Sequence, residues 1–458
     1  MQISFIKRFI PFAVLALVCV AGLFTPTHSN FNGASVYNGA DIAWVLVATA
    51  LVFLMTPGLS FFYGGMVNRR NVLSTMIKSF IATGVVSVLW VVVGYSLAFG
   101  KSMGGVIGNP LSNPFFMGVN SGSPWPGGPT IPLMLFALFQ LKFAIITPAL
   151  VVGAVAERIR FNAYLLFMVL FSLLVYAPIA HWTWHPDGFL NKMGVLDFAG
   201  GTVVHISAGC AALAGALVLK RRHSESTHPA NIPYVTLGTG LLWFGWFGFN
   251  AGSALAANAL AVTAFAATNT AAGAAGVAWV MFDVVRGKKP SVLGFCIGAV
   301  VGLVAITPAA GYVGVPQSLF IGFVAALVSI VAAHWKSKTG IDDTLDVFPC
   351  HGLGGIVGMI LTGVFASKVI NPTGANGLFY GEFSLFLSQL KGLGIVVGYS
   401  FTMSYLIFRL INVLSPLRVT RQEELVGLDE SQHGEKYVQG TLLVDSNSTG
   451  ELEEMEVR

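Results

Sequence analysis

Long apolar segments, each near the length that a helix needs to cross a membrane, recur along this 458-residue chain. The hydrocarbon core of a bilayer is about 30 Å thick, so one crossing takes about 20 mostly apolar residues. Charged residues make up only 10% of the chain, whereas a soluble domain has about 25%. The sequence therefore predicts an all-α integral membrane protein with eleven transmembrane helices. The expected spans are residues 39–66, 71–99, 131–156, 162–183, 199–219, 234–255, 262–285, 291–308, 317–334, 347–367 and 385–413.

Basic residues are unequally distributed between the loops that join these spans. The loops after odd-numbered spans carry most of the Lys and Arg residues, and those after even-numbered spans hold only Lys101, Lys192 and Lys368. Lys and Arg concentrate in cytoplasmic loops, so we expect the mature N-terminus outside and the C-terminus in the cytoplasm. Because the basic residues lie in short loops, the formal charge of +5 indicates no nucleic-acid partner.

The first 29 residues have the pattern of a secretory signal peptide. Lys7 and Arg8 form a positive region, an apolar run follows, and polar residues lead to a cleavage position near Ser29. An uncleaved first helix is the alternative. Cleavage would export the mature N-terminus, as the loop charges also predict, and would leave residues 30–415 as the membrane domain.

Two histidines interrupt the apolar spans, one in each half of the chain. His205 begins HISAG and His351 begins HGLGG, so spans five and ten both contain H-x-x-x-G. A five-span unit repeated once must be inverted, and transporters with inverted repeats bind substrate near the midplane. Ionisable groups in a membrane are costly and usually functional. Two neutral imidazoles can hydrogen-bond each other; two separate histidines satisfied by the backbone are the alternative.

Asp197 and Asp346 stand at the starts of spans five and ten. A carboxylate at a helix N-terminus accepts hydrogen bonds from free N–H groups and meets the positive end of the helix dipole. We therefore expect both to act as structural caps. Direct cation binding by Asp197 is the competing interpretation.

Aromatic residues are dense near the expected outer membrane edge and in two spans. HWTWHP carries Trp182 and Trp184, and FQLKF carries Phe139 and Phe143. Such residues form interfacial belts in membrane proteins, or they can hold a cation over their rings with about 0.5–2 kcal/mol. Composition alone leaves both interpretations open.

The sequence suggests neither a metal centre nor a cofactor. The four cysteines lie in apolar runs without metal spacing or a disulfide framework, and no carboxylate or thiolate is clearly placed to complete a metal site beside the histidines. Lys142 is unexplained, because a lysine at the centre of a membrane costs about 2.5–3.5 kcal/mol.

Longer motifs give the chain a specific resemblance. It resembles the ammonium transporter (Amt/Rh) family, on its Amt side, along nearly the whole mature chain and in the expected order. The matching motifs are FLMTPGLSFFYGG at 53–65, FQLKFAIITPALVVGAVAERIRF at 139–161, DFAGGTVVHISAG at 197–209, GWFGFNAGSA at 245–254, DVFPCHGLGGIVG at 346–358 and GLDESQHGEKY at 427–437.

The resemblance implies an outer cation-recruitment site made by Phe139, Trp184 and Ser253. Asp197 matches an acidic residue that supports this site without touching the ion. The segment after Trp184 is longer than in some members, so Trp182 is the competing candidate for that position.

The resemblance also implies the interior of the pore. Phe143 and Phe249 match a stacked phenyl gate, and His205 and His351 match twin histidines beneath it. The implied fold is an inverted five-plus-five repeat, assembled as a homotrimer in the cell inner membrane with one pore per subunit. Ammonium would lose its proton and pass as ammonia, which excludes potassium; whether net transport is electrogenic stays open.

Residues 416–458 form a polar tail that we expect to be cytoplasmic and regulatory. Gly427, Asp429, His433 and Gly434 resemble turn and hydrogen-bonding positions of the family's ordered C-terminal region, which packs under the bundle. A PII-type nitrogen regulatory protein is an implied partner on the same face, beside ammonium or ammonia as substrate and membrane lipid as surroundings.

Three other functions remain open from the residues. A sensor would need an appended signalling domain, and only about 40 residues follow the last span. An intramembrane enzyme would need a nucleophile or metal set beside the histidines, and none is evident. A gas channel of the Rh branch is the nearest alternative, but GWFGFNAGSA and GLDESQHGEKY favour the Amt branch.

Overall fold

The computed structural model spans the chain and describes residues 2–26, 36–120, 123–223 and 228–437. The described residues form a helical bundle with one small antiparallel ladder, in which β1 (Ser102–Met103) pairs with β2 (Ile107–Gly108). The helices in the expected spans are α2 (Gly39–Met66), α3 (Val72–Phe80), α4 (Ala82–Leu89), α5 (Tyr95–Phe99), α6 (Leu133–Val155), α7 (Phe161–Phe171), α8 (Ala177–Trp184), α10 (Ser207–Leu219), α11 (Ile232–Ala251), α12 (Ala259–Val285), α13 (Val292–Ile306), α14 (Val315–Lys336), α15 (Gly354–Phe365) and α16 (Phe383–Leu414).

The protein is an all-α multi-pass membrane protein, as predicted. Nine helical stretches of the described residues are long and apolar enough to cross a membrane. The two remaining expected spans are occupied by α11 and α13, but α13 has only 15 residues and α11 is not among the nine. The count of eleven crossings therefore stays a prediction.

Four spans change from α-helix to a wider π turn along their length. These turns are η2 (Trp90–Gly94), η4 (Ser172–Tyr176), η5 (Gly201–Ile206) and η7 (Phe348–Leu353). Short π segments inside helices occur often at functional sites. His205 lies in η5 and His351 lies in η7, so both predicted pore histidines stand on a wider π turn.

The two histidine-bearing spans approach each other closely through glycine. A Cβ atom at Gly209 would overlap the backbone of Gly352, so a larger residue would push the spans apart. Small residues allow this kind of close approach between membrane helices. Gly209 is the glycine of the first H-x-x-x-G pattern, which explains one of the two repeated residues as a packing requirement.

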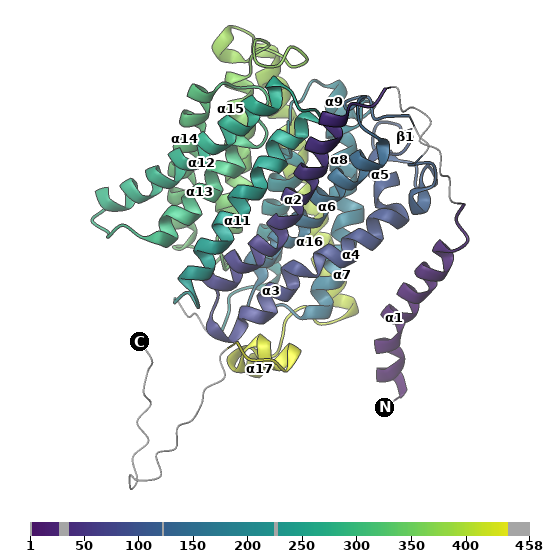
Figure 1. The fold of residues 1–458 in the computed structure, drawn as a ribbon. Helices are drawn as coiled ribbons and strands as arrows, with labels where there is room; N and C mark the ends of the chain where they lie inside the picture. Colours follow the sequence, from purple (N-terminus) through teal and green to yellow (C-terminus); the bar gives the residue numbers. More distant parts are fainter. Residues whose placement is uncertain (1, 27–35, 121–122, 224–227, 438–458) are drawn as a thin grey trace.

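Two helices near the ends of the described chain lie outside the bundle. Helix α1 (Gln2–Gly22) stands to one side, and α17 (Arg421–Val426) lies under the end of the bundle opposite α9 (Phe189–Lys192) and β1 (Figure 1). The predicted cleavage position near Ser29 and tail residues 438–458 lie outside the described residues. Short helical turns complete the fold: η1 (Arg69–Asn71), η3 (Pro114–Phe116), η6 (Gly252–Ala254), η8 (Leu378–Tyr380) and η9 (Asp429–His433).

Candidate functional site

An open cavity of about 540 Å³ lies at the end of the bundle opposite the tail. The predicted recruitment residues Phe139, Trp184 and Ser253 all line it, together with Phe143 and Asp197. We call this cavity the vestibule. Helix α6, the end of α8, the loop before η5 and the turn η6 therefore bring the predicted outer site together.

Trp184 and Trp182 point to different places. The indole Nε1 of Trp184 donates to the backbone oxygen of Asp197 over 3.0 Å, and its ring meets Phe143 at a centroid distance of 5.8 Å. Trp182 instead donates to the backbone oxygen of Val106 and packs against Tyr399. Only Trp184 lines the vestibule, so the geometry favours Trp184 for the outer site.

Ser253 presents an oxygen with free lone pairs at the vestibule. Its hydroxyl donates to the backbone oxygen of Phe249 over 2.8 Å. A hydroxyl that donates its one hydrogen still has two acceptor lone pairs. The side chain is therefore prepared to accept hydrogen bonds from a bound donor.

Phe143 and Phe249 close the floor of the vestibule. Their ring centroids lie 4.2 Å apart with the planes tilted by 32°, and neither side chain is exposed. Phe139 packs against Phe143 at 4.9 Å. The ring of His205 follows at 6.0 Å from Phe249, so the aromatic floor separates the vestibule from the histidines.

His205 and His351 are neighbours in the interior of the bundle. Their Nδ1 atoms lie 3.4 Å apart, and both side chains are buried. Trp246 stacks on His205 with a centroid distance of 5.3 Å. The Nε2 atom of His205 is buried and has no hydrogen-bond partner among the described residues. The two histidines are therefore not separate, and at least one ring nitrogen is left for a further contact.

Two small, mostly apolar cavities adjoin His351. One is lined by His205, His351, Phe249 and apolar side chains such as Leu59. The next, toward the tail, is lined by His351, Tyr63 and Cys350. Vestibule, aromatic floor, histidines and inner cavity thus follow one another through the bundle.

Asp197 holds the start of the span that contains His205. One carboxylate oxygen accepts from the N–H groups of Gly200 (2.8 Å) and Gly201 (2.6 Å), and the other accepts from the N–H of Thr202 (2.7 Å) and from its hydroxyl. The expected cap is therefore present. Both oxygens are engaged by the protein, which favours a supporting role over direct cation binding.

The expected cap at Asp346 is wrong, because Asp343 takes that place. The Asp343 carboxylate accepts from the N–H groups of Val347 (3.0 Å) and Phe348 (2.7 Å). Asp346 has a positive φ of 56° and pairs with Lys336 over 2.7 Å. The left-handed backbone conformation at Asp346 turns the chain, so that the carboxylate of Asp343 reaches the start of η7. The sequence signal was available, because the spacing from Asp343 to His351 repeats that from Asp197 to His205.

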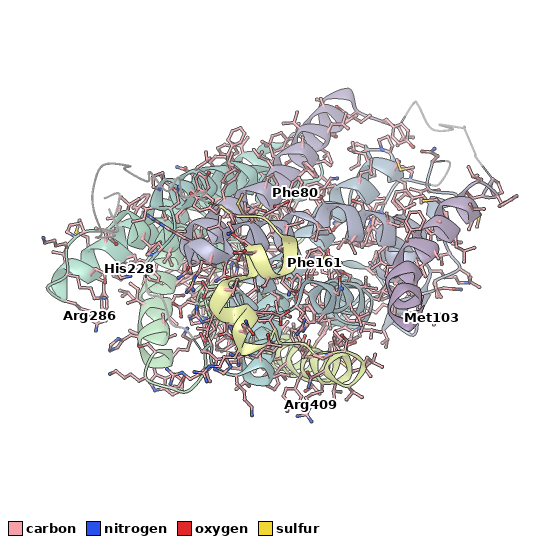
Figure 2. The ribbon with its side chains drawn as sticks, turned by 90° about the horizontal axis from the view of Figure 1, so that it is seen from below. Phe80, Met103, Phe161, His228, Arg286 and Arg409 are labelled. Atoms are coloured by element: carbon pink, nitrogen blue, oxygen red, sulfur yellow. The ribbon has the colours of Figure 1, made fainter. Side chains whose placement is uncertain are left out.

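The described part of the tail, residues 416–437, docks on the bundle. Asp429 accepts from the N–H groups of Leu73 (3.1 Å) and Ser74 (2.7 Å). The His433 ring packs edge-on against Phe161 at 5.1 Å. Seen from below, the tail ribbon crosses the middle of this face beside Phe161 (Figure 2). This segment of the tail therefore packs against the bundle rather than extending into solvent.

The backbone angles of two tail glycines and the pKa shifts of two tail side chains agree with the docked position of the tail. Gly427 and Gly434 have φ values of 105° and 68°, conformations that favour glycine. A Cβ atom at Gly427 would also overlap Arg70. Burial raises the pKa of Asp429, with the N–H groups around it acting in the opposite direction, and burial lowers the pKa of His433.

Lys142 stays outside the site. Its Nζ lies over the Phe53 ring at 5.2 Å from the centroid, and it is not among the residues that line the vestibule. Gln140, which sequence reasoning missed, does line the vestibule, and its amide oxygen has no hydrogen-bond partner among the described residues. The available signal was its polar amide inside an apolar span, within the FQLKF motif.

Comparison with known proteins identifies the family. Residues 43–438 match the Ammonium Transporter Family. A putative ammonium transporter of Methanothermobacter thermautotrophicus is 48% identical over 401 residues, which cover 87% of this chain and 98% of that one. The ammonium transporter of Bacillus subtilis is 46% identical over 404 residues, 88% of this chain and 99% of that one.

Solved structures agree with the sequence comparison. The crystal structure of Saccharomyces cerevisiae Mep2 superposes with a TM-score of 0.80 at 34% identity and covers 84% of this chain and 88% of that one. A structure described as a sensor Amt protein gives a TM-score of 0.79 at 30% identity and covers 86% and 98%. From the matched motifs, the shared fold and these relatives, the chain belongs to the ammonium transporter family.

Proposed function

We propose that this ammonium transporter recruits ammonium in the vestibule, removes a proton there and conducts ammonia past His205 and His351. The observation that carries the proposal is the histidine pair, with 3.4 Å between its Nδ1 atoms, buried directly beneath the packed rings of Phe143 and Phe249. A polar pair without fixed charge suits a small neutral solute with several N–H groups.

Recruitment relies on ligands that replace part of the ion's water shell. The rings of Trp184 and Phe139 offer π-faces, each worth about 0.5–2 kcal/mol to a cation. Ser253 offers a hydroxyl oxygen with free lone pairs. Asp197 supports this site indirectly. Its carboxylate fixes the start of η5, and its own backbone oxygen accepts from the Trp184 indole. These contacts suit ammonium and ions of potassium size alike.

Selectivity arises at the aromatic floor. Moving an ion through an apolar constriction carries a large desolvation cost. Ammonium can lose a proton and continue as neutral ammonia, whereas potassium has no proton to lose. The N–H bond breaks, the electron pair stays on nitrogen, and the proton is either released into the vestibule or relayed by the histidine pair. The first route is electroneutral and the second carries current.

Reconstitution into liposomes tests the proposal. An inward ammonium gradient is applied while current and luminal pH are recorded together. Conduction of ammonia raises the luminal pH, because ammonia binds protons inside. A relayed proton adds an inward current and reduces the alkalinisation. Neither a current nor a pH change, from protein that is folded and correctly inserted, would overturn the proposed function.

We further infer the surroundings of this pore from family resemblance and charge distribution. The protein assembles as a homotrimer in the cell inner membrane, with its mature N-terminus outside and residues 416–458 in the cytoplasm. Residues 1–29 are removed as a signal peptide. The docked tail acts as a cytoplasmic valve, and a PII-type regulator binds on the same face. Crosslinking of intact membranes followed by mass analysis tests the trimer.

A further inference from the structure

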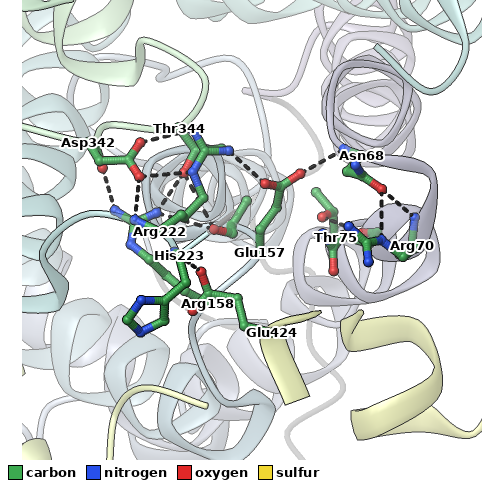
Figure 3. A network of polar contacts seen from close by, with 12 residues as sticks. Asn68, Arg70, Thr75, Glu157, Arg158, Arg222, His223, Asp342, Thr344 and Glu424 are labelled. Carbon is green, nitrogen blue, oxygen red and sulfur yellow. Dashed lines mark hydrogen bonds and ion pairs between the residues drawn. The ribbon is translucent and has the colours of Figure 1, made fainter. Parts of the chain in front are cut away.

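A cluster of charged side chains is buried at the tail end of the bundle, away from the transport path. Glu157 and Arg158 follow α6, Arg222 follows α10, and Asp342 lies between α14 and η7. The side chains of Glu157, Arg222 and Asp342 are only 5%, 13% and 8% exposed. Figure 3 shows them converging from three loops. We call Glu157, Arg222 and Asp342 the clamp.

Arg222 is the centre of the clamp. Its Nε and Nη2 atoms donate to both oxygens of Asp342 over 2.9 and 3.0 Å, and its Nη1 donates to Glu157 over 2.6 Å. Its backbone N–H also donates to Asp342 over 2.9 Å. Burial alone would raise the pKa of Asp342, but hydrogen bonds from Arg222 bring it below its ordinary value. A planar guanidinium can make such a two-pronged contact and a lysine cannot.

The clamp adjoins the start of the span that contains His351. Asp343, directly after Asp342, caps η7 through Val347 and Phe348. Arg158 also holds the loop that contains Asp342 and Asp343. It donates to the Thr344 hydroxyl over 2.7 Å and to the backbone oxygen of Asp342. The position of the cap therefore depends on both arginines.

The tail contacts the residue next to the centre of the clamp. Glu424 accepts from the backbone N–H of His223 and pairs with Arg418 over 2.8 Å. Arg418 in turn donates to the backbone oxygen of Leu219 over 3.0 Å. The side chain of Glu424 is only 2% exposed. Docking of the tail therefore fixes the backbone on both sides of Arg222.

We propose that Arg222 is a positioning residue for transport: it holds the cap beneath His351 and transmits the docked state of the tail to the pore. The inference rests on the proposed role of His351 in the pore. Coupling between distant sites needs a contiguous set of packed or hydrogen-bonded groups, and the contacts from Glu424 through His223, Arg222 and Asp342 to the cap form such a set.

Arg222→Lys is the decisive variant, because it keeps the charge and removes the two-pronged contact. Uptake of labelled methylammonium is measured per folded protein. We expect the maximal rate to fall about twofold to thirtyfold, the range of measured coupling energies, with KM unchanged because the vestibule lies at the other end. Arg286→Lys is the matched control, since Arg286 lies on the same face over the Phe282 ring and outside the clamp.

A double-mutant cycle with Glu424→Ala tests the link to the tail. If the tail acts through Arg222, each single variant slows transport and the double variant is no slower than the worse single one. Additive effects would overturn the coupling. Removing one partner from a buried ion pair is strongly destabilising, so Arg222→Gln is also combined with Asp342→Asn. The double variant removes one positive and one negative charge and so restores the net charge of the clamp; partial rescue of the maximal rate is expected.

The outcomes separate this inference from the proposed function. A wild-type maximal rate in Arg222→Lys, while His351→Ala abolishes uptake, would overturn the clamp and leave the pore intact. If Arg222→Lys lowers the amount of folded protein but leaves uptake per folded molecule unchanged, Arg222 only stabilises the fold and the inference is likewise overturned. Wild-type uptake in His351→Ala would instead contradict the pore itself.

Discussion

Asp197 and Asp343 occupy equivalent places in the two halves of the protein. The spacing from Asp197 to His205 equals that from Asp343 to His351, and each carboxylate accepts from N–H groups where the π turn with the histidine begins. Each histidine therefore stands on a π turn at the start of its helical stretch, and a carboxylate holds that start.

Substitution of Asp197 should separate geometry from charge. Asp197→Ala loses every contact of the cap, and we expect a stability loss of about 0.5–2 kcal/mol together with reduced transport. Asp197→Asn keeps one acceptor oxygen, but its amide NH₂ faces N–H groups, so it should lie between wild type and alanine. Thermal unfolding and methylammonium uptake measure both. Normal transport by the Asn variant would rule out any need for the negative charge.

Loss of the Trp184 ring should weaken recruitment. For Trp184→Leu we expect a KM for methylammonium about twofold to thirtyfold higher, corresponding to a cation–π contact of about 0.5–2 kcal/mol. Trp182→Leu is the control, because Trp182 is buried against Tyr399 away from the vestibule. It should lower stability and leave KM unchanged. The reverse pattern would assign the outer site to Trp182.

The tail should affect transport without contact to the pore. In Gly427→Asp the new side chain overlaps Arg70, and the φ of 105° with ψ of 150° suits only glycine. We expect faster proteolysis of the tail and slower methylammonium uptake. Gly434→Asn is the control, because its left-handed φ of 68° tolerates Asn and no atoms stand near a Cβ there. Equal uptake in both variants would show that docking has no effect on transport.

The cap at Asp343 should make stability depend on pH. Burial raises the pKa of Asp343 from 3.8 to about 6, with Asp346 acting in the same direction and Lys336 and the N–H groups of Val347 and Phe348 opposing. The folded state thus holds a proton that the unfolded state releases near its ordinary pKa. This contribution is complete below the unfolded value and is lost as the pH rises through about 6.

Thermal unfolding between pH 4 and pH 7.5 measures that dependence. Relative to Asp343→Asn, the wild-type protein should lose stability as the pH rises over this range, because only the wild type releases the proton. Asp342→Asn serves as a comparison, since the pKa of Asp342 is lowered rather than raised. Its contribution is lost only as the pH falls through that lowered pKa, so it should not decline as the pH rises over this range. Parallel curves for wild type and Asp343→Asn would contradict a raised pKa at Asp343.

The sequence predicted the helical membrane fold and the family, and it named residues that the structure brings together around the vestibule and the histidine pair. Apolar segment length alone indicates a helical membrane protein, and the motifs around His205 and His351 are long enough to indicate the family and the outer site. These features are local in the chain, so spacing and residue type carry them. The distinction between Trp182 and Trp184 needed the structure, because both residues are aromatic and the segment beyond them is longer than in some members.

The cap at Asp343 was missed although its spacing from His351 repeats that of Asp197 from His205, and the clamp could not be predicted from local patterns. Three acidic residues, Asp342, Asp343 and Asp346, precede span ten, and the left-handed backbone at Asp346 determines which of them reaches the helix start. Glu157 and Arg222 lie in loops between spans, where nothing in the local sequence marks them for burial. Their burial results from loops far apart in the chain meeting at one place, which no single segment encodes.

The most direct test of the central claim is uptake of labelled methylammonium by the double variant His205→Ala, His351→Ala in liposomes. Gel filtration and thermal unfolding first establish that the variant is folded and assembled as the wild type is. We expect uptake to fall to the level of empty liposomes, because the buried pair is the polar ligand set of an otherwise apolar cavity. Uptake at the wild-type rate by the folded double variant would contradict it.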